Sequence, residues 1–599
     1  METSQGDLDL IVKRIRAAGT DLARVEVKAA AGGLPTTIWE TISSFSNGRG
    51  GLIILGLDER TGFRPAVGFD ATAIRDAVSD GFRPRRASDP DGPLTPRPQG
   101  TIDVGVVDGS PVVVVEVEEL PAEQKPSFVT TRGKENGSFE RTSDGDRRMS
   151  THAIFLLATA SAQPTDDRHP VDGAGYEDLD ASLIERFVRR LRRVRPRAVA
   201  DLRDDREILV RFGVLDADRN SPTLAGLLAF GRYPQQYFPQ LMISFAAYPG
   251  RDKAVVAGDV RMLDRRIIDG PIPAMVDDAV SALLQNLKTR RVSRGAGAVD
   301  EPEIPVDALR EAVVNALSHR DYSAYALGEQ VRIEVYPDRV EIHNPGGIYG
   351  GRGEIDLYDG SSRSRNATLS SLLPEVPFPD RDETISENAG SGIPRMTGVL
   401  GQAGLTAPRF RSTVTSMSVT LDRHGILTPE VDAWLDGIGA RELTRHGRIA
   451  LALVRHGFDV HDQLLRSQLG IDTEEAKQVL RELVSQGWLS YPRRPGDAYR
   501  VGAILARGII DSQPPLVDLP FEQPRPAGHD SMSLDERVLA WLEILGESDI
   551  HELAILAEST PGSLRPRLRV LVDQGAIDPT AAPQSRNRRY LLRRSSDLG

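Results

Sequence analysis

The chain has 599 residues, enough for about four domains, and its 40% hydrophobic and 27% charged residues are typical of folded globular proteins. The formal net charge of −12 argues against a protein that coats nucleic acid, but local basic patches remain compatible with it because charge acts over only about 10 Å. The chain has no cysteine, no run of about 20 apolar residues and no N-terminal secretion signal, which excludes disulfides and thiolate zinc sites and predicts a cytoplasmic protein without membrane contact.

The first region, which we place at residues 1–162, alternates between predicted helices and strands. The helices are expected near 8–18, 34–46 and 150–159, and the strands near 24–28, 52–59, 101–107 and 111–118. Four motifs follow one another: Val-Glu-Val-Lys at 25–28, Phe-Ser-Asn-Gly-Arg-Gly-Gly at 45–51, Gly-Leu-Asp at 56–58 and a looser Gly-Ser-Phe-Glu-Arg at 137–141. Over about residues 20–155 this order resembles the Schlafen AlbA-type domain, which implies an α/β fold that binds nucleic acid.

Some Schlafen proteins cleave structured RNA with three carboxylates, and the resemblance places these at Asp21, Glu26 and Asp58. Three such carboxylates would hold Mg²⁺ or Mn²⁺ and activate water for phosphodiester cleavage. The zinc-binding cysteines and histidine of animal Schlafen proteins are absent, and the first acid is Asp rather than Glu. The alternative is a structural role in ion pairs, for example of Glu26 with Lys28 or Arg24.

A linker rich in Gln, Pro, Asp and Gly, at 163–175, precedes a central region that we place at 176–300. This region predicts several helices and a strand at 238–245, with no catalytic constellation, and we interpret it as a coupler between the outer modules. Seven arginines lie between residues 186 and 197, on a predicted helix and its exit. A solvated helix face and a phosphate-binding surface are both compatible with this pattern.

Residues 307–322 predict an amphipathic helix that places Glu311 and Asn315 on one face, because they are four residues apart. An amide oxygen can ligate Mg²⁺, and a carboxylate one turn away can orient a water molecule. Two predicted strands follow, at 331–336 and 339–343, and then two glycine-rich segments, at 344–347 and 387–396.

The order of helix, hairpin and two glycine boxes resembles the Bergerat (GHKL) ATP-binding fold of gyrase B, MutL and histidine kinases, an α/β sandwich. The most specific resemblance, over about residues 305–422, is to the branch described as helicase C-terminal domains. It implies ATP and Mg²⁺ in a domain at 301–425, with Asn315 on the metal and Glu311 on the attacking water. The nucleotide-binding positions would be Asn315, Asn344, Gly346, Gly347, Gly390, Gly392 and Ile393. The family's first glycine box centres on an Asp that contacts the adenine amino group, and Asn344 stands in that place.

The last third of the chain repeats one pattern. Helices are predicted at 443–456, 463–469 and 474–486 with a hairpin at 487–501, and again at 534–545, 550–556 and 562–574 with a hairpin at 577–592. Three helices and a two-stranded wing predict a winged helix-turn-helix, a common DNA-binding unit, at 440–505 and at 530–595. The second copy carries the arginines expected to contact DNA: Arg565, Arg567, Arg569, Arg586, Arg588 and Arg589. The first copy has mixed charge, and we interpret it mainly as a protein interface.

Together these features predict a multidomain α+β protein with tandem winged helices. The leading hypothesis is an ATP-binding bacterial transcription regulator in which nucleotide binding controls DNA binding, assembled as a dimer or higher homo-oligomer. The second hypothesis is a metal-dependent Schlafen-type endoribonuclease that acts on RNA in phage defence. The third is a non-enzymatic, nucleotide-stabilised assembly protein. Whether the protein is an enzyme, as a weak GHKL-type ATPase or as a ribonuclease, is left open.

Overall fold

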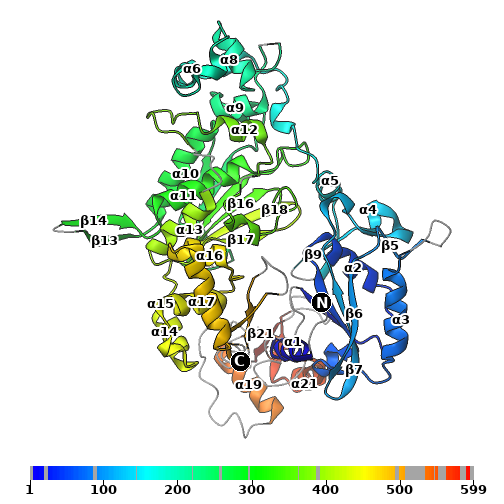
Figure 1. Ribbon diagram of the computed structural model, residues 1–599. Helices are drawn as coiled ribbons and strands as arrows, with labels where there is room; N and C mark the ends of the chain where they lie inside the picture. Colours follow the sequence, from blue (N-terminus) through cyan, green and yellow to red (C-terminus); the bar gives the residue numbers. More distant parts are fainter. Residues whose placement is uncertain are drawn as a thin grey trace. The chain divides into compact units, whose positions relative to one another are not determined.

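The computed structural model contains two compact units, Met1–Gln513 and Pro514–Gly599 (Figure 1). The residues it describes are 5–18, 24–84, 91–142, 145–218, 220–254, 260–294, 297–361, 363–385, 392–492, 498–502, 504–505, 533–545, 547–550, 553, 561–580 and 589–593. They form a mixed, multidomain α/β protein with several sheets. Within these ranges, no helix is long and apolar enough to span a membrane.

The N-terminal sheet has the strand order β1-β2-β7-β6, with β1 and β2 parallel and the other pairs antiparallel. The strands are β1 (Val25–Lys28), β2 (Gly51–Leu55), β6 (Gly100–Val107) and β7 (Ser110–Val117). Helices α2 (Ile38–Asn47) and α3 (Ala71–Phe82) pack on one face, and α1 (Gln5–Ala18) packs on the other. Burial of both faces explains the continuous apolar runs of β2 and β7. The sequence predicted these elements to within four residues, except α3, which it missed.

Shorter elements complete this region. They are β3 (Leu57–Asp58), β4 (Arg64–Pro65), β5 (Leu94–Thr95), β8 (Phe128–Val129), α4 (Gly133–Gly137), β9 (Phe139–Thr142), β10 (Gly145–Arg148) and α5 (Thr151–Ala158). The buried side chain of Asn47 joins them to α2, because its Nδ2 donates to the carbonyls of Ser127 (2.8 Å) and Phe139 (3.1 Å). This asparagine belongs to the 45–51 motif, which therefore has a structural role in closing the region around α2.

A six-stranded sheet with the order β12-β11-β15-β16-β18-β17 is the second large sheet. Its strands are β11 (Ile243–Ala247), β12 (Asp264–Ile268), β15 (Val331–Val335), β16 (Arg339–Pro345), β17 (Arg409–Ser412) and β18 (Ser416–Asp422). Only β11 and β15 are parallel among these neighbouring pairs. The sheet extends across the boundary that the sequence placed between residues 300 and 301, and one hydrophobic core includes buried residues from Val171 to Leu421.

Helices cover one face of this sheet (Figure 1). They include α10 (Ile272–Asn286), α11 (Val306–Ser318) and α13 (Gly392–Gln402). Helix α11 ends at Ser318, four residues before the predicted end. The chain turns away there because the backbone N–H of Asp321 donates to the carbonyl of Pro345, at 2.8 Å, instead of continuing the helical ladder.

The other helices near this sheet are α6 (Ala181–Val194), α7 (Pro196–Val199), α8 (Asp205–Arg211), α9 (Leu224–Phe230) and α12 (Ala367–Leu372), and a hairpin is formed by β13 (Thr289–Arg294) and β14 (Gly297–Pro302). The arginines of α6 have acidic partners. Arg190 pairs with Glu375 at 3.0 Å, and Arg192 pairs with Asp205 at 2.6 Å. These contacts favour the solvated, ion-paired interpretation of α6 over a phosphate-binding surface.

The C-terminal third contains two groups of helices and antiparallel strands. The first is α14 (Pro429–Gly437), α15 (Arg445–Arg455), α16 (Asp462–Leu469), α17 (Thr473–Ser485), β19 (Leu489–Ser490) and β20 (Arg500–Val501), with a core of its own. The second is α19 (Leu534–Leu545), β21 (Glu547–Asp549), α21 (Pro561–Asp573), β22 (Ile577–Pro579) and β23 (Arg589–Leu592), in which the strand order is β21-β23-β22. Most of the helix predicted at 550–556 lies outside the described residues.

Candidate functional site

A cavity of about 260 Å³ opens between α11, α13 and the end of β16. It lies on the helix-covered face of the six-stranded sheet. Glu311, which was predicted to orient the attacking water, lines it together with five of the seven residues predicted to bind nucleotide: Asn315, Asn344, Gly347, Gly392 and Ile393. The structure therefore brings together residues as far apart in the sequence as Glu311 and Ile393. Gly390 lies outside the described residues, and Gly346 lies beside the cavity rather than on its wall.

The pair Glu311 and Asn315 forms one wall of the cavity. Asn315 Nδ2 donates to Glu311 Oε1 at 3.0 Å, as the spacing of one helical turn allows. The amide oxygen of Asn315 is therefore the atom of that side chain left to accept a hydrogen bond or to ligate a cation. Gly392, at the start of α13, faces the same carboxylate. A Cβ atom at Gly392 would lie 1.8 Å from Glu311 Oε1, so a larger residue at this position would require the Glu311 carboxylate to move.

The first glycine box is packed against backbone. Gly346 has φ = +86°, and a Cβ atom there would lie 2.8 Å from the Cβ of Asp321. A Cβ atom at Gly347 would lie 2.0 Å from the carbonyl oxygen of Thr413. Both positions thus require glycine, one for its left-handed conformation and both for close approach. Next to them the buried Asn344 donates from Nδ2 to the carbonyl of Pro345, at 3.1 Å.

Four arginines also line the cavity: Arg310, Arg352, Arg363 and Arg395. Among the described residues that line the cavity, Asp307 and Glu311 are the only two with carboxylates. Arg310 and Arg395 each lie 3.6 Å from a carboxylate oxygen of Asp307, a distance longer than a strong charged hydrogen bond. Arg352 pairs with Asp359 at 2.7 Å, and the positive charge of the other arginines favours an anionic ligand. Sequence reasoning missed these arginines, because they come from a helix face, a loop and the second glycine segment.

Behind the first glycine box, Asp321 connects the cavity region to α5. His152 Nε2 lies 2.7 Å from Asp321 Oδ2, and the His152 ring stacks on Tyr325 with centroids 5.4 Å apart. Burial opposes ionisation of Asp321, but hydrogen bonds from His152 and from the backbone and hydroxyl of Ser323 outweigh it and lower the pKa of this carboxyl. Asp321 is therefore a charged, buried link between Gly346 and the end of the N-terminal region.

The carboxylates predicted for RNA cleavage have structural contacts. Glu26 pairs with Lys28 at 2.7 Å and with Arg141 at 2.8 Å, which matches the ion-paired alternative. Asp58 accepts from the backbone N–H of Arg60 at 3.0 Å and so caps a short turn. Asp21 lies outside the described residues. Within the described part of the chain, neither Glu26 nor Asp58 belongs to a group of three side chains close enough to hold a metal ion.

The arginines predicted to contact DNA are divided between described and undescribed segments. Arg565, Arg567 and Arg569 are exposed on α21, but Arg567 pairs with Asp535 at 2.8 Å. Arg589 is half-buried in β23. Arg586 and Arg588 lie outside the described residues.

Comparison with known proteins gives two local matches. Residues 328–421 match a family model. Its description is "Putative ATP-dependent DNA helicase recG C-terminal". Residues 156–244 match a second model, described as a domain of unknown function. The first match includes both glycine segments, whereas Glu311 and Asn315 precede it. No curated protein matches the chain.

Two solved structures are similar over different lengths. The DIP2311 protein from Corynebacterium diphtheriae has 18% sequence identity over 98% of this chain and 99% of its own, with a TM-score of 0.33. The N-terminal domain of a "Putative ATP-dependent DNA Helicase RecG-related Protein" from Nitrosomonas europaea has 23% identity over 25% of this chain and 95% of its own, with a TM-score of 0.19. Both TM-scores lie below 0.5, too low for either similarity to establish a shared fold.

Proposed function

We propose that this protein binds ATP and Mg²⁺ in the cavity beside α11 and binds DNA through its C-terminal helices, so that nucleotide occupancy controls DNA binding. The observation that carries this proposal is the Glu311–Asn315 pair in a cavity with four arginines and two closely packed glycine boxes. The family model over residues 328–421, named for an ATP-dependent DNA helicase, adds support.

The donor set of the cavity suits a nucleotide with its metal ion. Asn315 would hold Mg²⁺ through Oδ1, because its Nδ2 is engaged with Glu311. Mg²⁺ would offset the charge of the phosphates, and Glu311 would orient a water molecule beside them. The four arginines supply phosphate contacts, and the N-terminus of α13 adds backbone N–H groups that favour anions. The carboxamide of Asn344 has both a donor and an acceptor, so it can contact a purine edge where an Asp would only accept.

At the level of domains, we propose a GHKL-like ATP-binding domain at 301–425 whose sheet is extended by β11 and β12 of the coupling region. Winged helices are proposed at 440–505 and 530–595, with an AlbA-like nucleic-acid-binding domain at 1–162. Helix α13 is the proposed route of coupling. Its first residue, Gly392, packs against Glu311, and Gly401 near its other end packs against the backbone of Gln468 in α16. A nucleotide that shifts α13 would therefore also shift the first winged helix.

The experiment is ATP binding and turnover by the full-length protein with Mg²⁺, measured for the wild type, Asn315→Ala and Glu311→Ala. We expect Asn315→Ala to weaken ATP binding at least about tenfold, because the metal loses its protein ligand. Glu311→Ala should retain binding and lose turnover, if the wild type has any. Glu185→Ala, on the exposed face of α6, is the control and should match the wild type. A wild type that binds no ATP, or an Asn315→Ala variant that binds it equally well, would contradict the proposal.

The ribonuclease and assembly hypotheses have less support. Glu26 is neutralised by Lys28 and Arg141, which leaves it poorly placed to hold a metal ion for cleavage. A divalent-dependent loss of structured RNA that disappears in Glu26→Gln would reverse this preference. An ATP-dependent change in mass without any DNA binding would favour the assembly hypothesis instead.

A further inference from the structure

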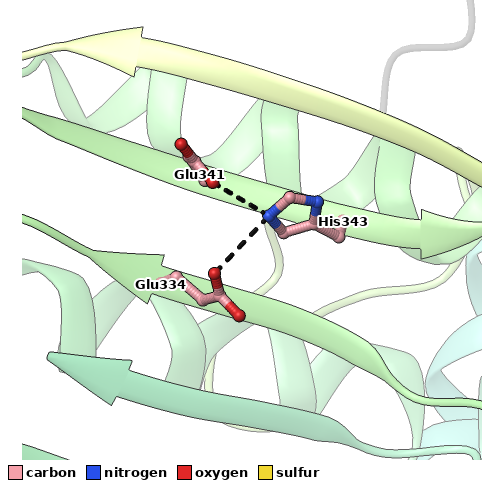
Figure 2. A group of neighbouring side chains, drawn as sticks. All are labelled: Glu334, Glu341 and His343. Atoms are coloured by element: carbon pink, nitrogen blue, oxygen red, sulfur yellow. Dashed lines mark hydrogen bonds and ion pairs between the residues drawn. The ribbon is translucent and has the colours of Figure 1, made fainter. Parts of the chain in front are cut away.

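The face of the six-stranded sheet opposite α11 carries a group of three side chains that is separate from the cavity. Along β15, Val331, Ile333 and Val335 belong to the hydrophobic core, and alternation directs Glu334 to the other face. Glu334 is paired directly with Glu341 of β16. His343, two residues farther along β16, is on the same face as both glutamates (Figure 2).

The three side chains converge on one point between the strands. Figure 2 shows one nitrogen of the His343 ring facing both carboxylates. His343 Nε2 lies 3.2 Å from Glu341 Oε2 and 3.6 Å from Glu334 Oε2. One ligand atom from each residue lies within 4.8 Å of the other two. Among the described residues, no other group of three histidine or acidic side chains comes this close.

These distances fit ligands of a common metal ion. Both are longer than the about 2.7–2.9 Å of a strong charged N–H···O bond, and the contact of His343 Nε2 with Glu341 Oε2 lies within hydrogen-bond range. In a tetrahedral Zn²⁺ site the metal–ligand bonds are about 2.0–2.2 Å long, so two ligand atoms lie about 3.3–3.6 Å apart. The spacings of 3.2 and 3.6 Å between Nε2 and the two Oε2 atoms match such edges.

The outer oxygens of both carboxylates are already anchored. Glu334 Oε1 pairs with Lys253 Nζ at 2.6 Å, and Glu341 Oε1 pairs with Arg339 Nε at 2.5 Å. The hydroxyl of Tyr336 donates to Glu334 Oε2 at 3.0 Å. Glu341 is thus fixed by one oxygen and presents the other to His343, whereas Glu334 is held at both oxygens and its Oε2 faces both Tyr336 and His343. Partners of this kind orient the ligands of protein metal sites.

We propose that Glu334, Glu341 and His343 form a site for a divalent transition-metal ion of the Zn²⁺ class, with the fourth position taken by water. An imidazole and two carboxylates suit Zn²⁺ or Co²⁺ better than Mg²⁺, which prefers oxygen ligands alone. The side chain of Glu334 is 6% exposed, whereas those of Glu341 and His343 are 21% and 24% exposed, so the ion would be reached from the side of β16. The site is independent of the cavity and does not require that ATP bind there.

The test is metal binding by the full-length protein after treatment with a chelator, without nucleotide. Zn²⁺ is titrated against a coloured chelator, and Co²⁺ is titrated with the visible absorption of a tetrahedral complex as the readout. The wild type should bind one tightly held equivalent. Glu341→Gln and His343→Gln should each weaken it at least about tenfold, since each removes a ligand. Asn315→Ala should leave it unchanged, which separates this site from the proposed nucleotide site.

One further variant and one further measurement keep the result decisive. His169→Gln removes an exposed histidine far from the three ligands in sequence, and it should bind Zn²⁺ as the wild type does. Thermal unfolding without metal shows whether each variant is folded. If His343→Gln is unfolded, the Glu341→Gln variant decides alone. Equal Zn²⁺ binding by the wild type and a folded Glu341→Gln variant would overturn the proposal, and the three side chains would then be a proton-bridged cluster.

Discussion

His461 illustrates at the residue scale how burial determines charge. It precedes α16, where its Nδ1 accepts from the backbone N–H of Leu464 at 3.4 Å, and it is 2% exposed. Its Nε2 is buried and has no hydrogen-bond partner among the described residues. Burial lowers the pKa of His461 to about 4, against the opposing effect of Asp462 and Asp356, because the imidazolium would lose its hydration.

The pKa of His461 predicts a loss of stability in acid. Its ordinary pKa is 6.5, so between pH 6.5 and about pH 4 the unfolded chain binds a proton that the folded chain does not. The free energy of unfolding therefore falls as the pH falls through this window. From about pH 7 to about pH 5 the effect is about 2 kcal/mol. His461→Asn retains a capping side chain and does not titrate, so its melting temperature should fall less over the same range. His169→Asn, at an exposed histidine, should follow the wild type, and parallel curves for His461→Asn would refute the assignment.

At the scale of elements, α13 connects the cavity to the first C-terminal group of helices. A Cβ atom at Gly401 would lie 2.1 Å from the carbonyl oxygen of Gln468, and Gln468 Nε2 donates to the carbonyl of Leu405 at 2.7 Å. The contact is between backbones, so it cannot adjust by changing a side-chain rotamer. Alanine has a higher helix propensity than glycine. The close packing of α16 against position 401 explains why this residue of α13 is nevertheless glycine.

We expect Gly401→Ala to destabilise the protein by about 1–3 kcal/mol, because the added methyl group must displace the backbone of α16. The matched control is Gly437→Ala at the end of α14, where a Cβ atom would meet nothing within 4 Å. That control should change stability by less than about 1 kcal/mol, in the stabilising direction. Thermal unfolding measures both, and equal melting temperatures for the two variants would show that α13 and α16 are not tightly packed in solution.

For the whole molecule, the proposed function predicts that DNA binding depends on salt and on nucleotide. Arg565 and Arg569 are the arginines of α21 best placed to contact phosphates, since Arg567 pairs with Asp535. Each lost phosphate contact lowers the slope of log affinity against log salt by about 0.9, so the double variant Arg565→Ala/Arg569→Ala should lower it by about 1.8. Binding of random-sequence duplex DNA by fluorescence anisotropy, with and without ATP, provides the measurement.

The control for this prediction is Arg189→Ala/Arg192→Ala on α6. These side chains are 70% and 54% exposed and already pair with acids, so the salt slope should not change. An unchanged slope in the α21 variant, or an equal change in both, would show that DNA binding does not use α21. If ATP alters the affinity of the wild type, the same effect should be absent in Asn315→Ala, because that variant is expected to lose nucleotide.

The sequence by itself determined the type and position of most elements. Helix α11 and its Glu311–Asn315 pair followed from spacing along one helix, and β1, β2, β6 and β7 followed from their apolar patterns, because both are short-range properties of the chain. Tertiary structure decided the rest. Contacts between strands, helices and loops determine four features that the sequence did not predict. These are the pairing of β11 with β15, the arginines around the cavity, the ion pair of Glu26 with Arg141 and the convergence of Glu334 with His343. Such contacts depend on strand register and packing, which local periodicity does not determine.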